Sequence, residues 1–135
     1  MFAIKNKKKV FLIIALIVVL AAAAFFTYYM MGVSSYQERV QSTIVSDVDT
    51  SAIPDGSYIG EYDVGLVYAK VEVHVKSGKI ADISILEHRN GRGTTAESIV
   101  DSIISSQKID VDAVSGATSS STVIKKAVEL ALLRD

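Results

Sequence analysis

The sequence predicts an α+β fold: a small antiparallel sheet with two helices packed on it, preceded by one amino-terminal transmembrane helix. Three observations lead to this prediction. Residues 10–33 are an uncharged, mostly apolar run, residues 70–76 alternate apolar and polar side chains, and two later segments repeat apolar residues at helical spacing. With both helices on one face of the sheet, all of these apolar surfaces are buried at once.

The amino-terminal run has the length and the flanks of a membrane anchor. About 20 apolar residues cross a bilayer, and residues 10–33 exceed that length. The lysines that precede the run are Lys5, Lys7, Lys8 and Lys9. By the positive-inside rule the amino terminus stays cytoplasmic, so everything after Ser34 faces outward. The expected organisation is a basic tail (1–9), an anchor (10–33), a linker or stalk (34–53) and a carboxyl-terminal domain (54–135).

A cleavable signal peptide is the alternative interpretation of the same segment. Residues 21–24 are alanines, which offer small side chains for a cleavage site. Either segment would export the domain. Apolar residues continue beyond the usual signal core, at Phe25, Phe26, Met30 and Met31. This continuation favours an uncleaved, single-pass anchor in the cell membrane.

The exported part begins with strand patterns. Residues 34–52 are rich in polar residues and are expected to prolong the membrane helix or to form a loose tether. After a turn at residues 54–56, strands are expected at 57–63, 70–76 and 79–87, forming a meander. The side chains expected on one face are Val71, Val73 and Val75 in the second strand, and Ala81, Ile83 and Ile85 in the third.

Two helices are expected after the strands. Thr94 and Glu97 have the spacing of a capping box, so a helix should begin there. Its apolar face would carry Ile99, Val100, Ile103 and Ile104, and that of the last helix Val123, Ile124, Ala127, Val128, Ala131 and Leu132. Both stripes have the helical period.

The turn before the last helix carries the strongest chemical signal. Residues 112–118 read Asp-Ala-Val-Ser-Gly-Ala-Thr, and three serines follow. Gly116 can take positive φ and leaves room beside Thr118, and Ala117 keeps the neighbouring position small. The amides of Ser119, Ser120 and Ser121 would be unpaired donors at a helix start, a site that attracts phosphate. The Thr118 hydroxyl becomes a phosphoryl acceptor once a separate enzyme supplies a base and a metal.

These residues resemble the Asp-x-x-Ser/Thr-Gly-Ala-Thr motif of FMN-binding domains, found in sodium-pumping NADH:quinone reductase and in the Rnf complex. The resemblance extends from about residue 55 to residue 133. It implies FMN held on Thr118 by a phosphoester, which a flavin transferase installs, and partners among membrane or surface electron-transfer proteins. The binding residues expected around Thr118 are Asp112, Ser115, Gly116, Ala117, Ser119 and Ser120.

Each of these residues also has an ordinary structural interpretation. Serine and threonine at a helix entrance are common caps, and Asp-x-x-Ser-Gly is common turn chemistry. Asp112 would either position the motif or bond nearby amides. Outside the motif, Tyr62 and His88 are candidates to contact the flavin, but tyrosine is also a normal strand residue and a lone loop histidine is more often at the surface. Arg92 would bind the phosphate or a reduced flavin, or remain solvated.

Two further tyrosines and one further arginine are also candidates. Tyr58 and Tyr68 could flank the flavin ring, and Arg89 could bind its phosphate. Small members of the family resemble this chain where Glu87 and His88 end a strand and glycines follow.

Composition excludes several classes of function. The chain has no cysteine, which excludes disulfides and cysteine-ligated clusters. Net charge is −1, and four of its 14 basic residues precede the anchor, so the exported part is acidic and unsuited to nucleic acid. The two histidines lack the spacing of metal ligands, and no hydrolase constellation is evident.

Three functions therefore remain. The first is an electron-transfer flavoprotein with little or no substrate turnover of its own. The second is a domain that binds FMN or another ligand noncovalently, as a sensor. The third is a surface interaction protein in which Thr118 is only a cap.

Overall fold

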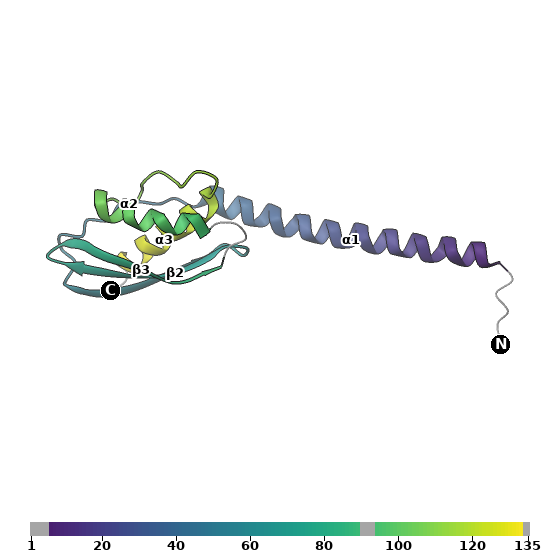
Figure 1. Ribbon diagram of the computed structural model, residues 1–135, viewed down its shortest axis with the longest axis horizontal. Coiled ribbons are helices and arrows are strands. Elements are labelled where there is room, and N and C mark those ends of the chain that lie inside the picture. The colour runs from purple at the N-terminus through teal and green to yellow at the C-terminus, as the bar shows by residue number, and fades with distance from the viewer. Residues whose placement is uncertain (1–5, 90–93, 134–135) are drawn as a thin grey trace. The chain divides into compact units, whose positions relative to one another are not determined.

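The computed structural model describes residues 6–89 and 94–133, in two compact units divided after residue 35 (Figure 1). The first unit is part of helix α1 (Lys7–Ser42). The second holds strands β1 (Gly56–Asp63), β2 (Tyr68–Lys76) and β3 (Lys79–Arg89), the 3-10 helix η1 (Thr94–Ser98) and helices α2 (Ile99–Ser106) and α3 (Thr118–Leu133). The α+β prediction, with a long apolar helix first, is confirmed.

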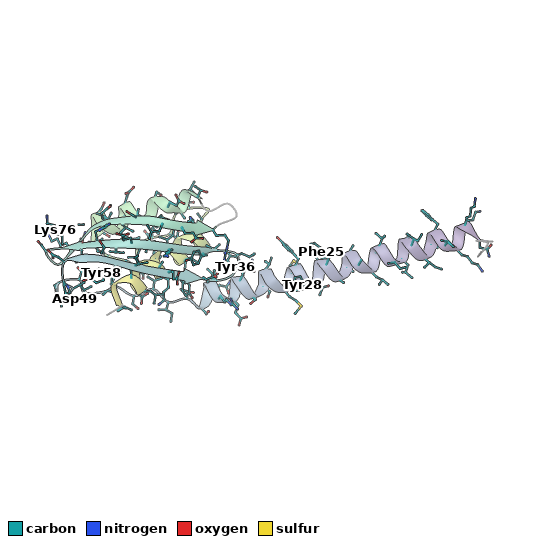
Figure 2. All side chains as sticks on the ribbon, turned by 90° about the horizontal axis from the view of Figure 1, so that it is seen from below. Phe25, Tyr28, Tyr36, Asp49, Tyr58 and Lys76 are labelled. Carbon is teal, nitrogen blue, oxygen red and sulfur yellow. The ribbon has the colours of Figure 1, made fainter. Side chains whose placement is uncertain are left out.

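Helix α1 carries an exposed apolar surface. Phe25 and Tyr28, labelled in Figure 2, are 72% and 79% exposed. The helix is long and apolar enough to cross a membrane, and a signal sequence near an amino terminus meets the same two criteria. Its last turns belong to the second unit, where Tyr36 and Val40 are partly buried against the core.

The sheet is the predicted antiparallel meander, in the order β1-β2-β3. The alternation in β2 is confirmed, because Ala69, Val71, Val73 and Val75 are buried and their neighbours are not. Helix α3 contacts β1 and β2, and α2 contacts β3. The core therefore lies between one face of the sheet and the two helices.

The predicted inward face of the third strand is wrong at Ala81, which is exposed while Ile80 is buried. The pairing register shifts twice, so that Ala81 and Leu86 are extra residues in β3 with no partner in β2. A bulge inserts one residue and therefore reverses which later side chains face inward. The second bulge carries the strand on to Arg89 and sets His88 opposite the buried Ala69.

The helix expected from residue 94 begins there as η1 and continues as α2. Ile99 and Ile103 are buried and Val100 and Ile104 are partly buried, which confirms the predicted face. Gln107 ends α2 in the left-handed conformation, with φ of 55°. Its side-chain amide accepts from Ile80 N and donates to Ile80 O, both at 2.8 Å, so it ties the end of α2 to the first bulge of β3.

Helix α3 lies directly against the backbone of β1. All six residues predicted for its apolar face are buried. A Cβ atom built on Gly60 would lie 2.1 Å from Ala127 O and 2.4 Å from Ala131 N, which is far inside contact distance. Only glycine permits this approach, since any side chain at residue 60 would have to displace the helix.

The segment between α1 and β1, residues 43–53, lies along the domain and is here named the strap. Thr43 Oγ1 bonds Tyr62 Oη at 2.8 Å, Lys126 Nζ donates to Ile44 O at 2.9 Å, and Thr50 Oγ1 donates to Gly78 O at 2.7 Å. Side chains of the strap that pack on the core are Val45, Val48 and Ile53. These contacts make the strap part of the domain's packing.

Candidate functional site

The residues before α3 form a tight turn that requires glycine. Ala117 N donates to Val114 O at 3.0 Å, which closes a four-residue turn. Gly116, the third residue, has φ of 77°, as a type II turn requires. A Cβ at Gly116 would meet no atom within 4 Å, so the space beside the turn is open. Residues 112–118 are named the acceptor turn below.

Ser121 holds the acceptor turn from beneath. Its side chain is fully buried, and its Oγ accepts from Val114 N at 3.0 Å and donates to Ala117 O at 2.7 Å. Its amide also donates to Ala117 O, at 3.0 Å. The expectation that the Ser121 amide is unpaired is therefore wrong, because α3 begins at Thr118 and Ser121 makes its first backbone bond. The amides ahead of that bond are those of Thr118, Ser119 and Ser120.

The predicted motif residues differ in accessibility. Thr118 is exposed as the first residue of α3. Asp112, Ser115 and Gly116 are exposed, Ser119 is half-buried, and Ala117 and Ser120 are buried. Thr118 is thus an exposed residue of the acceptor turn, close to the open space at Gly116. The amides that precede the first helical bond and the positive end of the helix dipole make this helix start suitable for a phosphate group.

Two charged side chains that sequence reasoning passed over hold the chain just ahead of the acceptor turn. Asp47 Oδ1 accepts from Ile109 N at 2.8 Å and from Asp110 N at 2.9 Å. Lys125 Nζ donates to Val111 O at 2.8 Å and pairs with Asp110 Oδ1 at 3.2 Å. Lys125 is only 8% exposed although it is charged. Its place four residues after Ser121, within the apolar pattern of the helix, is the signal that could have identified it.

Asp47 is acidified by these contacts. Mainly the amide hydrogen bond from Asp110, and with it the one from Ile109, holds the pKa of Asp47 below its ordinary value, because both favour the ionised carboxylate. The same sense of shift occurs in Asp49, where hydrogen bonds from Ser51 lower the pKa. The two carboxylates differ in how far along the chain their partners lie, because Asp49 accepts hydrogen bonds only from Ser51, two residues away.

His88 lies in β3 with a buried side chain, whereas the sequence placed it in a loop, where a surface position was the alternative to flavin contact; contact of His88 with the flavin stays a prediction. Its side chain is 2% exposed, because the second bulge of β3 turns it inward. His88 Nδ1 lies 3.1 Å from Glu97 Oε1 of η1. Helix η1 contacts α3, and Figure 1 shows the starts of η1 and α3 at the same end of the domain. His88 thus connects the end of β3 to the layer that contains the acceptor turn.

Three tyrosine hydroxyls that were flavin candidates are engaged within the fold. Tyr62 bonds the strap at Thr43, and Tyr58 Oη donates to Pro54 O at 2.6 Å. Tyr68 Oη donates to Glu61 Oε2 at 2.7 Å, and chiefly this bond raises the pKa of Tyr68 to about 12. Flavin contacts by Tyr62 stay a prediction.

The two candidate arginines have different outcomes. Arg89 Nη2 donates to Gly65 O at 3.0 Å and pairs with Asp63 at 3.3 Å, and its guanidinium lies 5.5 Å from the Tyr68 ring centroid. These contacts occupy Arg89 at the end of the sheet. Arg92 lies outside the described residues. Across residues 6–89 and 94–133, no group of three or more histidine and carboxylate side chains could hold a metal ion.

Comparison with known proteins identifies the domain. A family model described as "FMN-binding domain" matches residues 66–133. No curated protein matches the chain. The matched residues contain β2, β3, both helices of the domain and the acceptor turn, while the strap and β1 lie before them. The match covers half of the chain, and the protein belongs to the FMN-binding domain family.

Proposed function

We propose that this protein is a membrane-anchored, extracytoplasmic flavoprotein that carries FMN on Thr118 through a phosphoester and transfers electrons between membrane or surface partners. The observation that carries the proposal is the exposed Thr118, which begins α3 two residues after Gly116, where a built Cβ meets no atom within 4 Å. FMN, when bound, supplies the redox chemistry.

The residues around Thr118 fit a phosphate in this position. The amides of Thr118, Ser119 and Ser120 precede the first helical bond and provide donors, and the helix dipole favours negative charge there. Gly116 and Ala117 are small, and a Cβ built at Gly116 meets no atom within 4 Å, which favours room for a large group near Thr118. The family match to FMN-binding domains is consistent with this fit.

Thr118 also has the environment of a residue modified by another enzyme. Among the described residues, no hydrogen bond joins a carboxylate or an imidazole to its hydroxyl, so a base for the reaction is expected from the modifying enzyme. In the transfer, Oγ1 would bond to the FMN phosphorus of a flavin dinucleotide donor as the donor's phosphoanhydride P–O bond breaks; the nucleoside monophosphate leaves, and a base of the flavin transferase takes up the hydroxyl proton. The exposure of the turn gives such an enzyme access.

Intact-mass spectrometry tests the covalent bond. The full chain is co-expressed with a flavin transferase, and the wild type should gain the mass of one FMN less one water. Thr118→Ala should remain unmodified. Thr122→Ala is the matched control, since its hydroxyl lies one turn later and bonds only Thr118 O. An unmodified wild type, or a modified Thr118→Ala, would contradict the assignment.

Denaturing gel fluorescence separates the alternatives to the covalent carrier. Flavin that stays with the chain after denaturation supports the phosphoester. Flavin that purifies with the native protein but leaves on denaturation supports noncovalent binding, as in a ligand-binding sensor. A colourless protein from a host with the transferase supports a cofactor-free surface interaction protein.

Cysteine labelling in whole cells tests the topology, since the natural chain has no cysteine. A membrane-impermeant maleimide should label Ala52→Cys in intact cells and Lys8→Cys only after permeabilisation. Retention of residue 8 in the mature protein would support an anchor, and its loss would support a cleaved signal peptide. Labelling of Lys8→Cys from outside would contradict the proposed orientation.

A further inference from the structure

We propose that Asp47 of the strap is a positioning residue, which holds the acceptor turn in the conformation that a flavin transferase recognises. The inference rests on the proposed function, and it concerns a residue that precedes the family-matched region 66–133. A part of the chain outside the recognised domain would thereby control how well Thr118 is modified.

The first step of the argument is the reach of Asp47. One carboxylate oxygen accepts from two successive amides, those of Ile109 and Asp110, at 2.8 and 2.9 Å. These partners lie 62 and 63 residues further along the chain. Hydrogen bonds to an ionised carboxylate are stronger than neutral ones. Ile109 is itself buried, so the loop formed by residues 109–117 is fixed at its start.

The second step is the continuity of the hold from Asp47 to Thr118. Lys125 binds Asp110 and Val111, and Ser121 binds Val114 and Ala117. Lys125 and Ser121 are four residues apart on α3 and so lie on one face of the helix. The strap therefore holds the amino end of residues 109–117, and α3 holds the remainder.

The third step is that residues 111–114 have no regular secondary structure of their own. Asp112 and Ala113 are exposed and make no helix or sheet bonds that would fix the loop. Removing the Asp47 carboxylate releases two amides at once and leaves residues 109–117 with side-chain hydrogen bonds from α3 alone, beside the packing of Ile109 in the core. The acceptor turn then samples several conformations, of which the flavin transferase recognises one. The apparent affinity of the transferase for the protein falls in proportion to the population of that conformation.

The matched control is Asp49, two residues away in the same strap. Its carboxylate is also exposed and also accepts hydrogen bonds, from the Ser51 amide at 3.0 Å and the Ser51 hydroxyl at 2.6 Å. Those bonds are local and do not reach residues 109–117. Asp49→Ala thus changes charge and composition as Asp47→Ala does, but leaves the hold on the acceptor turn unchanged.

The test measures flavin transfer to the full-length chain in detergent, with initial rates recorded against the concentration of the acceptor protein. For Asp47→Ala we expect the KM of the transferase for this protein to rise roughly fivefold to tenfold, with kcat nearly unchanged. The rise is the expected effect of losing two charge-assisted hydrogen bonds. Asp49→Ala should match the wild type. Thermal unfolding of each variant fixes an assay temperature at which all are folded, so a change in overall stability cannot produce the KM effect.

Amide hydrogen exchange provides a readout that needs no flavin. Residues 109–117 should exchange faster in Asp47→Ala than in the wild type or Asp49→Ala. If Asp47→Ala fails to fold, Asp47→Asn replaces it, because asparagine keeps the shape of the side chain and is a weaker hydrogen-bond acceptor. Asp47→Asn should then show a smaller rise in KM and a smaller increase in amide exchange. A modified wild type with equal KM and equal exchange in the Asp47 variants overturns this inference alone. A wild type that is never modified on Thr118 overturns the proposed function instead.

Discussion

Helix α3 depends on one glycine at its start and on another against its middle, for opposite reasons. At its start, Gly116 has positive φ and open space around it, and Thr118 beside it is exposed. At its middle, the helix backbone lies against Gly60 with no room for a single added carbon. One glycine therefore serves the conformation of a turn, and the other serves the approach of a helix to a strand.

This difference shows how a small domain can combine access with rigidity. The middle of α3 is buried on the sheet, which fixes the helix in place. Its first turn extends to the surface, where a hydroxyl and free amides are available. A modification at Thr118 would then disturb no packed side chain, so we expect the domain to keep its fold when it is loaded.

The largest effect is expected from Gly60→Ala. The new Cβ would lie 2.1 Å from Ala127 O, so either α3 or β1 must move. Overpacking against backbone should cost about 3 kcal/mol or more of the free energy of unfolding. Chemical denaturation followed by circular dichroism measures it. Stability equal to the wild type would contradict the direct contact between α3 and β1.

Ser121→Ala should cause the next largest loss of stability, in the first turn of α3. The change removes a buried hydroxyl that serves Val114 N and Ala117 O. Leaving the Val114 amide without its acceptor should cost about 1–3 kcal/mol. The control Thr122→Ala removes a hydroxyl on the exposed face of α3, and its loss of unfolding free energy should be well below that of Ser121→Ala. Equal losses in the two variants would argue against a special role of Ser121 in the acceptor turn.

Gly116→Ala sharpens the comparison between the two glycines, since it is the same substitution as Gly60→Ala. The new Cβ meets no atom, so only the left-handed backbone is strained, at a cost of about 1 kcal/mol. Unfolding free energies of the two variants, measured together, should differ by about 2 kcal/mol or more. A larger loss at Gly116 than at Gly60 would reverse the interpretation.

The smallest effect is expected in the pH dependence of stability through Asp47. Its pKa in the folded state is lowered, so its contribution is present above the ordinary carboxyl value of about 4 and is lost as pH falls through the lowered folded value. The difference in melting temperature between wild type and Asp47→Asn should therefore shrink as the pH falls below about 4. A difference that stays constant over this range would contradict hydrogen bonding of the ionised Asp47 carboxylate to the amides of Ile109 and Asp110.

Local patterns in the sequence determined much of this protein. The uncharged run of α1, the alternation in β2 and the apolar stripes of α2 and α3 all depend on residues a few positions apart. The Ser-Gly-Ala-Thr turn was equally accessible, because positive φ at Gly116 is a local requirement. The α+β class followed from the periodic patterns, and the resemblance to FMN-binding domains followed from the residues of the turn.

The tertiary structure alone decided the rest. Two bulges turned Ile80 and His88 inward, the contact of α3 required Gly60, and Asp47 met amides 62 and 63 residues away. None of these leaves a periodic trace in the sequence. Each depends on which distant backbone groups come together when the helices pack on the sheet, and a buried amide must then be satisfied by whatever side chain lies within reach.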